Sequence, residues 1–247
     1  MGEQIEIVTT DGRFAAYRAL PSVPSAPAVV VLHELFGVNA DMRQTCDDLA
    51  ARGFLAICPD LFWRQQPGID LDVRSEADWK TGLALYGAFD RELGVSDIIA
   101  TVDAAAALTG SSGRVGILGY CLGGLMTFLT AARTSIDAAV AFHGAETEKY
   151  LDEAGAITTL MLMHLAGEDE FMPEDARNAI ITALDDKPNV QVFTYSGCHH
   201  AFSRHGGAHY DARAATLANQ RTWSFFTAML GRQAAPFSQR QQLGVLS

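Results

Sequence analysis

The sequence predicts an α/β fold: a mostly parallel central sheet of about eight strands, with helices on both faces and an antiparallel hairpin at the N-terminus. Short apolar runs alternate with helix-length segments along the chain, which is typical of parallel sheets. Residues 28–32 are apolar without interruption, as in a strand buried on both faces. Residues 5–9 and 14–20 flank a turn pair, Asp11 and Gly12, and predict the hairpin.

The other elements follow from apolar periodicity and from turn residues. Asn39 can cap a helix over residues 42–52, and a strand at residues 54–58 follows it. Residues 61–75 show no clear period and predict a long loop near the functional site. Further helices are expected at residues 76–89, 95–108, 122–132, 173–184 and 210–230, and further strands before Cys121 and at residues 138–142, 159–166 and 190–195.

Composition narrows the class of protein. The 247 residues suit a single α/β domain over residues 1–230 with a polar tail at residues 231–247. A hydrophobic fraction of 49% can fill a large core, and the net charge of -11 disfavours nucleic acid and anionic membranes as partners. No apolar run reaches membrane-spanning length, so we expect a cytoplasmic protein, and we expect a monomer. The four cysteines are far apart and are expected to be reduced thiols: Cys46, Cys58, Cys121 and Cys198.

Cys121 stands in a Gly-x-Cys-x-Gly motif between an apolar run and a helix-like segment. A strand that turns directly into a helix strains its pivot residue and requires small neighbours, which Gly119, Gly123 and Gly124 provide. The pivot also lies at a helix N-terminus, where free N–H groups and the helix dipole favour a thiolate. The motif predicts a nucleophile elbow, although a cysteine is more often a small buried apolar residue.

A nucleophile of this kind needs a base, and the base needs an orienting acid. Asp169 follows the strand expected at residues 159–166, and His200 follows the strand expected at residues 190–195. Nucleophile, acid and histidine then stand in the chain order of α/β-hydrolase folds, at the edge of the sheet where ligands bind. The neighbouring polar residues are the weaker alternatives: Glu168, Glu170 and Asp175 for the acid, and His199 for the base.

The other histidines are expected to be structural residues or to line the pocket. His143 ends the strand at residues 138–142 and either lines the pocket or is a structural histidine. His164 lies inside an apolar strand and is expected in the core. His205 and His209 lack cysteine or carboxylate partners at ligand spacing, so no metal site is expected, and no cofactor.

Together these motifs resemble the dienelactone hydrolase family of the α/β hydrolases. The resemblance covers about residues 27–230 and is carried by six short stretches: His-Glu-Leu-Phe-Gly-Val-Asn from His33, Cys-Pro-Asp-Leu from Cys58, Ala-Phe-Asp from Ala88, Gly-Tyr-Cys-Leu-Gly-Gly from Gly119, Gly-Glu-Asp from Gly167 and His-Ala-Phe-Ser-Arg from His200. It implies a triad of Cys121, Asp169 and His200, and an oxyanion hole formed by the N–H groups of Leu35 and Leu122.

The resemblance also gives roles to charged residues. It implies that Glu34 contacts the resting thiol and changes partner when substrate binds; the alternative is a loop carboxylate exposed by chance. It implies that Arg204 holds a substrate carboxylate, for which a planar fork of donors is well shaped; the alternative is a surface arginine. The family's second carboxylate-binding arginine is missing, and its neighbourhood contains Trp79 and Lys80, while Tyr86 replaces a family tryptophan. Further expected substrate contacts are Lys80, Trp79, Tyr86, Phe36 and His143.

The sequence therefore predicts an enzyme with no cofactor that acts on a small lactone or ester. The first hypothesis is a hydrolase that opens an enol lactone such as dienelactone to maleylacetate, in the breakdown of aromatic compounds. A general carboxylesterase or thioesterase with the same triad is the alternative within the class. A binding protein on a hydrolase fold is the alternative outside it, and the retained order of Cys121, Asp169 and His200 argues against that.

Overall fold

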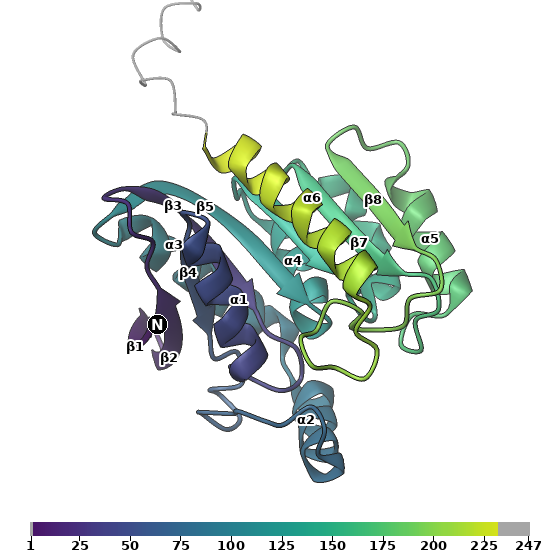
Figure 1. Cartoon of the computed structure of the whole chain (residues 1–247), viewed down its shortest axis with the longest axis horizontal. Helices are drawn as coiled ribbons and strands as arrows, with labels where there is room; N and C mark the ends of the chain where they lie inside the picture. The colour runs from purple at the N-terminus through teal and green to yellow at the C-terminus, as the bar shows by residue number, and fades with distance from the viewer. Residues whose placement is uncertain (1, 232–247) are drawn as a thin grey trace, which may run out of the picture.

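The computed structural model describes residues 2–231 and contains one eight-stranded sheet in the order β1-β2-β4-β3-β5-β6-β7-β8 (Figure 1). β1 pairs with β2 and β2 with β4 in antiparallel fashion, and the other pairs are parallel. The expected fold class, including the N-terminal hairpin, is confirmed. The strands are β1 (Glu3–Thr9), β2 (Gly12–Ala19), β3 (Ala26–Leu32), β4 (Leu55–Pro59), β5 (Ser111–Tyr120), β6 (Ala138–Phe142), β7 (Met161–Ala166) and β8 (Val190–Tyr195).

Helices cover both faces of the sheet because the central strands are apolar on both. Side chains alternate along β3, so that Val30 and Leu32 join one hydrophobic cluster while Val29 and Val31 join the other. α1 (Ala40–Ala51) and α6 (Ala212–Leu230) cover the second face, and both lie in front of the sheet in Figure 1. The opposite face packs against α3 (Arg91–Ala107), α4 (Leu122–Arg133) and α5 (Glu174–Leu184).

The structure differs from the sequence-based expectation most at the start of α3 and after β6; other element ends shift by one or two residues. α3 begins at Arg91 and not at residue 95, because the Asp90 side chain accepts hydrogen bonds from the Glu92 and Leu93 N–H groups and caps an earlier start. A 3₁₀ segment, η1 (Thr147–Ala156), follows β6 although no periodicity predicted it, and its backbone breaks from helical geometry at Tyr150. α2 (Glu76–Ala88) agrees with expectation. The tail expected at residues 231–247 lies outside the described residues, apart from Gly231.

The parallel strands bring distant residues to one edge of the sheet. Cys121 follows β5, His143 follows β6, Asp169 follows β7 and His200 follows β8. Since these strands run in the same direction, the loops after them meet at the carboxyl edge, where α/β sheets bind ligands. Across residues 2–231, no helix combines the length and the apolar character that a membrane crossing requires.

Candidate active site

Cys121 is the pivot between β5 and α4. Its backbone has φ 52° and ψ -110°, a conformation that few residues other than glycine adopt, and its side chain is buried. A Cβ at Gly119 would lie 1.9 Å from the Gly123 carbonyl oxygen, and one at Gly123 would lie 2.1 Å from the Leu32 carbonyl oxygen. The glycines therefore allow β3, β5 and α4 to approach closely, and the elbow geometry that the motif predicts is present.

Two backbone N–H groups come from different segments: Leu35 lies in the loop after β3 and lines the same cavity as Cys121, and Leu122 follows Cys121 at the pivot. Within residues 2–231, the N–H groups of Leu35 and Leu122 donate no hydrogen bond to another residue, whereas the Gly123 N–H donates to the His33 carbonyl at 3.1 Å. Leu122 is the first residue of α4, so its N–H belongs to the positive end of the helix. Free donors of this kind can hold an oxyanion.

His200 and Asp169 form a buried pair. His200 Nδ1 lies 2.9 Å from Asp169 Oδ1 and 3.0 Å from Oδ2, and both side chains are almost entirely buried. Within the described chain, His200 Nε2 has no hydrogen-bond partner, and His200 and Cys121 line the same cavity. Burial alone would lower the pKa of His200, but negative charge on the Cys121 sulfur and the hydrogen bond to Asp169 raise it to about 10. This imidazole can therefore carry a proton beside a thiolate.

Glu34 and Arg204 form a second buried pair. Arg204 Nε donates to Glu34 Oε2 at 2.6 Å and Nη2 donates to Oε1 at 2.8 Å. Their side chains are only 4% and 9% exposed, so neither is the exposed loop carboxylate or surface arginine of the alternatives. The Arg204 guanidinium also lies over the rings of Phe36 and Trp79, at 5.0 and 5.9 Å from their centroids. Glu34 thus faces Arg204 here, and not the thiol that the resemblance gives it at rest.

His143 lies against the catalytic candidates without a partner of its own. It is buried, has φ 36°, and its ring centroid is 4.5 Å from that of His200. Burial and the nearby charges of His200 and Arg204 hold the pKa of His143 well below its ordinary value, so the ring is neutral. Neither ring nitrogen has a hydrogen-bond partner within residues 2–231.

His143, His200 and Glu34 offer ligand atoms within 4.8 Å of one another. Both Glu34 oxygens already accept from the Arg204 cation, whose charge opposes a metal ion at the same place. This arrangement suits an ion pair better than a metal centre.

The cavity at Cys121 has a volume of about 180 Å³. Six of the residues expected at the site contribute to its walls, whereas Lys80 is exposed and outside them, Phe36 is fully buried beneath Arg204, and His143 stands behind His200. Four further residues line the cavity although the sequence did not predict them: Leu83, Ala145, Glu146 and Phe171. Leu83 lies one helical turn after Trp79, Ala145 and Glu146 lie in the loop after β6, and Phe171 lies two residues after Asp169, so each is close in sequence to an expected site residue or strand end. The lining residues are Leu35, Trp79, Leu83, Tyr86, Cys121, Ala145, Glu146, Phe171, His200 and Arg204.

The remaining histidines and cysteines have structural surroundings. His164 lies in the core, with Nδ1 2.9 Å from the Tyr195 hydroxyl and Nε2 3.2 Å from the Thr222 hydroxyl. His199 is half exposed and pairs with Glu170 at 2.8 Å, outside the cavity lining. His205 contacts Asp41. All four cysteines are free and buried, and burial raises the pKa of the Cys46 and Cys198 thiols.

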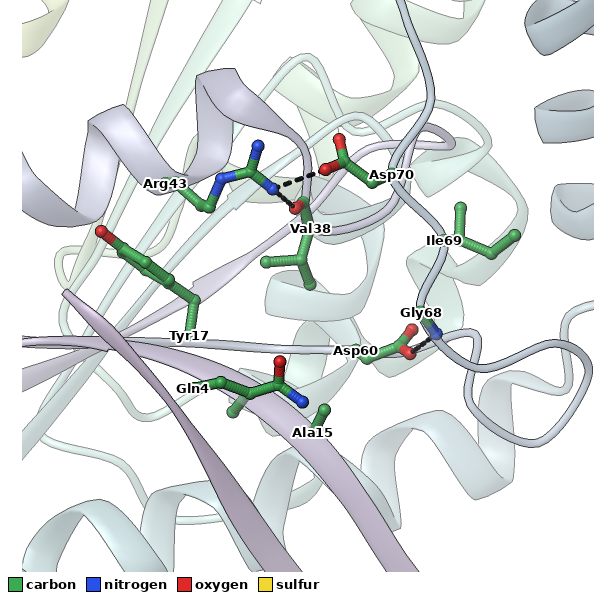
Figure 2. A pocket seen from close by; sticks show the side chains of 10 residues that line it. Gln4, Ala15, Tyr17, Val38, Arg43, Asp60, Gly68, Ile69 and Asp70 are labelled. Atoms are coloured by element: carbon green, nitrogen blue, oxygen red, sulfur yellow. Dashed lines mark hydrogen bonds and ion pairs between the residues drawn. The ribbon is translucent and has the colours of Figure 1, made fainter.

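A second cavity of about 200 Å³ lies between the N-terminal hairpin and residues 68–70 (Figure 2). Its charged groups are already paired: Arg43 donates to Asp70 at 2.8 Å and to the Val38 carbonyl at 2.6 Å, and Asp60 accepts from the Gly68 N–H at 2.7 Å. The loop at residues 61–75, expected near the functional site, thus contributes to this cavity and is absent from the lining of the Cys121 cavity. Of these two cavities, the one at Cys121 is therefore the candidate active site.

Known proteins resemble this chain over most of its length. The pattern of the family described as "Dienelactone hydrolase family" matches residues 14–230. A carboxymethylenebutenolidase from Pseudomonas putida is 38% identical over 232 residues, 94% of this chain and 98% of the relative. A provisionally named carboxymethylenebutenolidase from Azospirillum brasilense is 41% identical over 90% of this chain and 96% of the relative. A solved structure from Klebsiella pneumoniae, provisionally named a dienelactone hydrolase, has a TM-score of 0.82 at 27% identity and covers 92% of this chain and 98% of its own.

Proposed function

Because the chain belongs to the dienelactone hydrolase family, and is therefore a hydrolase of esters or lactones, we propose that it opens an enol lactone of the dienelactone type with Cys121 as nucleophile. The observation that carries this proposal is the strained, buried elbow of Cys121 in one cavity with a His200 that Asp169 orients. The product would be a keto acid of the maleylacetate type.

The first half of the reaction forms a thioester. The Cys121 thiolate adds to the lactone carbonyl, and the N–H groups of Leu35 and Leu122 stabilise the oxyanion that develops. Collapse of this intermediate breaks the ring C–O bond and expels the enolate, which takes the proton from His200 Nε2. The raised pKa of His200 supports this step, because it keeps that proton on the imidazole at neutral pH until the leaving group needs it.

The second half consumes water. His200, now neutral, removes a proton from a water molecule that attacks the thioester carbonyl, and the thiolate leaves as the acyl group is released as a carboxylic acid. The acid then ionises and gives its proton to the solvent. Asp169 accepts from Nδ1 throughout and stabilises the imidazolium, which is present at rest and forms again in the second half. One water is consumed per lactone, and both Cys121 and His200 return to their starting protonation states.

Arg204 would bind the carboxylate of an anionic lactone in exchange for Glu34. The pair is buried and bidentate, so a substrate carboxylate can replace Glu34 with the same geometry, and Glu34 is then released toward the thiol. The exchange would couple substrate recognition to the state of the nucleophile.

A general carboxylesterase or thioesterase is the second candidate. It is favoured by the lining of the cavity, which is mostly apolar, and by an Arg204 that already has a carboxylate partner. Both candidates use the same three catalytic residues and differ in the substrate that the cavity prefers.

Purified protein mixed with dienelactone tests the proposal directly. Steady loss of the lactone absorbance with formation of maleylacetate, at a kcat/KM well above that for a neutral aryl acetate, is the expected result. Turnover of the aryl acetate with no turnover of dienelactone would favour the general esterase over the proposed lactonase. With nitrophenyl acetate as the aryl ester, a single burst of nitrophenol without further turnover would show that a thioester forms but that water does not hydrolyse it.

A further inference from the structure

Glu146 occupies an unusual position in the Cys121 cavity. It lies four residues after the end of β6 and directly before η1, lines the cavity, and has φ 68° and ψ 8°, a left-handed conformation that disfavours a residue with a Cβ. Its side chain is 28% exposed. A strained non-glycine residue in a ligand cavity points to a role for its side chain.

The Glu146 carboxylate accepts hydrogen bonds from three side chains. Oε2 accepts from the Arg91 guanidinium at 2.6 Å and from the Tyr86 hydroxyl at 3.0 Å, and Oε1 accepts from the Lys149 ammonium. Tyr86 and Glu146 belong to the cavity lining, whereas Arg91 and Lys149 do not. The two cations therefore fix the carboxylate in place, beside a Tyr86 hydroxyl that donates to it.

Tyr86 has no hydrogen to offer a ligand. Its proton is donated to Glu146, and burial together with the negative charges of Cys121 and Glu146 raises the pKa of the phenol well above its ordinary value. The hydroxyl thus stays protonated and presents only lone pairs to the cavity. An incoming carboxylate would meet acceptors without donors there, while a hydroxyl or ammonium group would find acceptors already oriented.

We propose that Glu146 and Tyr86 form an acceptor subsite, which binds a hydroxyl or ammonium group of the substrate and excludes a carboxylate from that end of the cavity. The proposal rests on the proposed function, since it takes the Cys121 cavity as the place where the ester or lactone binds. Arg204, also in the lining, is the place for an anionic group, so the cavity wall contains one anionic side chain, Glu146, and one cationic side chain, Arg204. Glu146 is then a determinant of specificity and not of the chemical step.

A set of esters that differ only in charge tests the subsite. Nitrophenyl esters of one aliphatic acid are compared, with a methyl, an ammonium or a carboxylate group at the far end of the acyl chain. Glu146→Gln should raise the ratio of kcat/KM for the carboxylate ester to that for the methyl ester by about tenfold, and lower the ammonium ratio by a similar factor. Glu146→Gly removes the carboxylate while relieving the backbone strain, and should shift both ratios in the same directions.

Glu153→Gln is the matched control. Glu153 also forms a bidentate pair with an arginine, Arg133, at 2.7 Å, and its side chain is 24% exposed, but it is not in the cavity lining. Its ratios should equal those of the wild type. Ratios that stay unchanged in both Glu146 variants, or that change equally in Glu153→Gln, would overturn the subsite.

A second measurement separates this proposal from the proposed function. Alkylation of Cys121 by iodoacetate and by iodoacetamide compares an anionic with a neutral reagent and needs no turnover. Glu146→Gln should raise the rate ratio in favour of iodoacetate, because it leaves Arg91 without its counter-charge. No ester turnover together with the raised ratio would overturn the hydrolase proposal and retain the subsite. Turnover with an unchanged ratio would overturn the subsite alone.

Discussion

Cys121 is the residue on which the proposed chemistry depends. Cys121→Ala should lower kcat by about 10³-fold or more, because it removes the proposed nucleophile, while the far-ultraviolet circular dichroism stays that of the wild type. Cys121→Ser should also be much slower, because a serine hydroxyl ionises far less readily than a thiol and must lose its proton to His200 during the attack. Full activity in the serine variant would contradict a site tuned for a thiolate. Cys198→Ala, outside the cavity lining, serves as the control.

His200 makes a prediction about pH. Its pKa in the folded protein, about 10, lies above its ordinary value of 6.5, so the protonated ring stabilises the fold fully below pH 6.5 and loses that contribution as the pH rises toward 10. We expect kcat/KM for the lactone to fall only as the pH rises through the folded-state pKa of about 10, because the leaving enolate then loses its proton donor.

Histidine NMR titration checks this assignment. In Cys121→Ala the pKa of His200 should drop, since the negative charge on the sulfur is the main influence that raises it. His164 is the internal control, because burial lowers its pKa to about 3 and its signals should stay constant above neutral pH. If the pKa of His200 were the same with and without the thiol, the proposed ion pair between the Cys121 thiolate and the His200 imidazolium would be contradicted.

Arg204 and Glu34 are best tested together. Arg204→Ala should lower the free energy of unfolding by about 3 kcal/mol, because it leaves Glu34 buried with an unpaired charge. The double variant Glu34→Gln with Arg204→Ala should recover part of that loss, and chemical denaturation of the four proteins measures the coupling. If the coupling is absent, the pair contributes nothing to stability, and Arg204 is held in place by Phe36 and Trp79 instead.

At the scale of the element, the β5–α4 turn allows no side chain at Gly123. Gly123→Ala would place a methyl group 2.1 Å from the Leu32 carbonyl oxygen of β3, so the strand and the helix must separate. We expect a fall of more than about 2 kcal/mol in the free energy of unfolding, and slow alkylation of Cys121 by iodoacetamide. Gly87→Ala in α2 is the control: a Cβ there meets no atom within 4 Å, and the helix should gain up to about 1 kcal/mol. Equal stability of the two variants would show that the turn tolerates a wider spacing.

Most elements were predictable because their signals are local. Uninterrupted apolar runs predicted β3 and β6, and Asn39, whose side chain accepts from the Met42 N–H at 3.2 Å, predicted the start of α1. Local signals failed at η1, which has no apolar period and breaks at Tyr150. The start of α3 was misplaced because the capping role of Asp90 was overlooked.

At the scale of the whole molecule, Arg64 joins the hairpin to the rest of the protein. It donates to Asp11 in the hairpin turn and to both oxygens of Asp97 in α3, and Asp97 also accepts from Trp63 Nε1 at 2.8 Å. Because Asp97 is only 2% exposed, Asp97→Ala should lower the free energy of unfolding by about 3 kcal/mol.

The hydrolysis of a neutral aryl ester should survive that change, since the residues around Arg64 are outside the Cys121 cavity. Asp72→Ala, which breaks the exposed pair with Arg74, should leave the unfolding midpoint unchanged. If the free energy of unfolding fell by a similar amount in both variants, stability would depend on net charge and not on the buried Arg64–Asp97 pair.

The site was predictable only where chain order determines position. Parallel strands carry Cys121, Asp169 and His200 to one edge whatever the details of packing, so their proximity followed from order alone. The pairing of Glu34 with Arg204 joins residues 170 positions apart in the chain, and that of Tyr86 with Glu146 joins residues 60 apart. Such pairs depend on how loops fold over the sheet, which no local pattern encodes. The exposure of Lys80 likewise depends on tertiary packing and could not be inferred from a local pattern.

In the described chain, the non-glycine residues with positive φ are Cys121, His143, Glu146 and Ala201, and each lies in a loop after β5, β6 or β8. A protein engineer would conclude that heat resistance and catalysis compete at the carboxyl edge of the sheet. Ala201 contributes only a methyl group, so replacing it by glycine offers a way to relax this edge while the other three side chains remain. Replacing Cys121 or Glu146 would give up the proposed role of that side chain in exchange for stability.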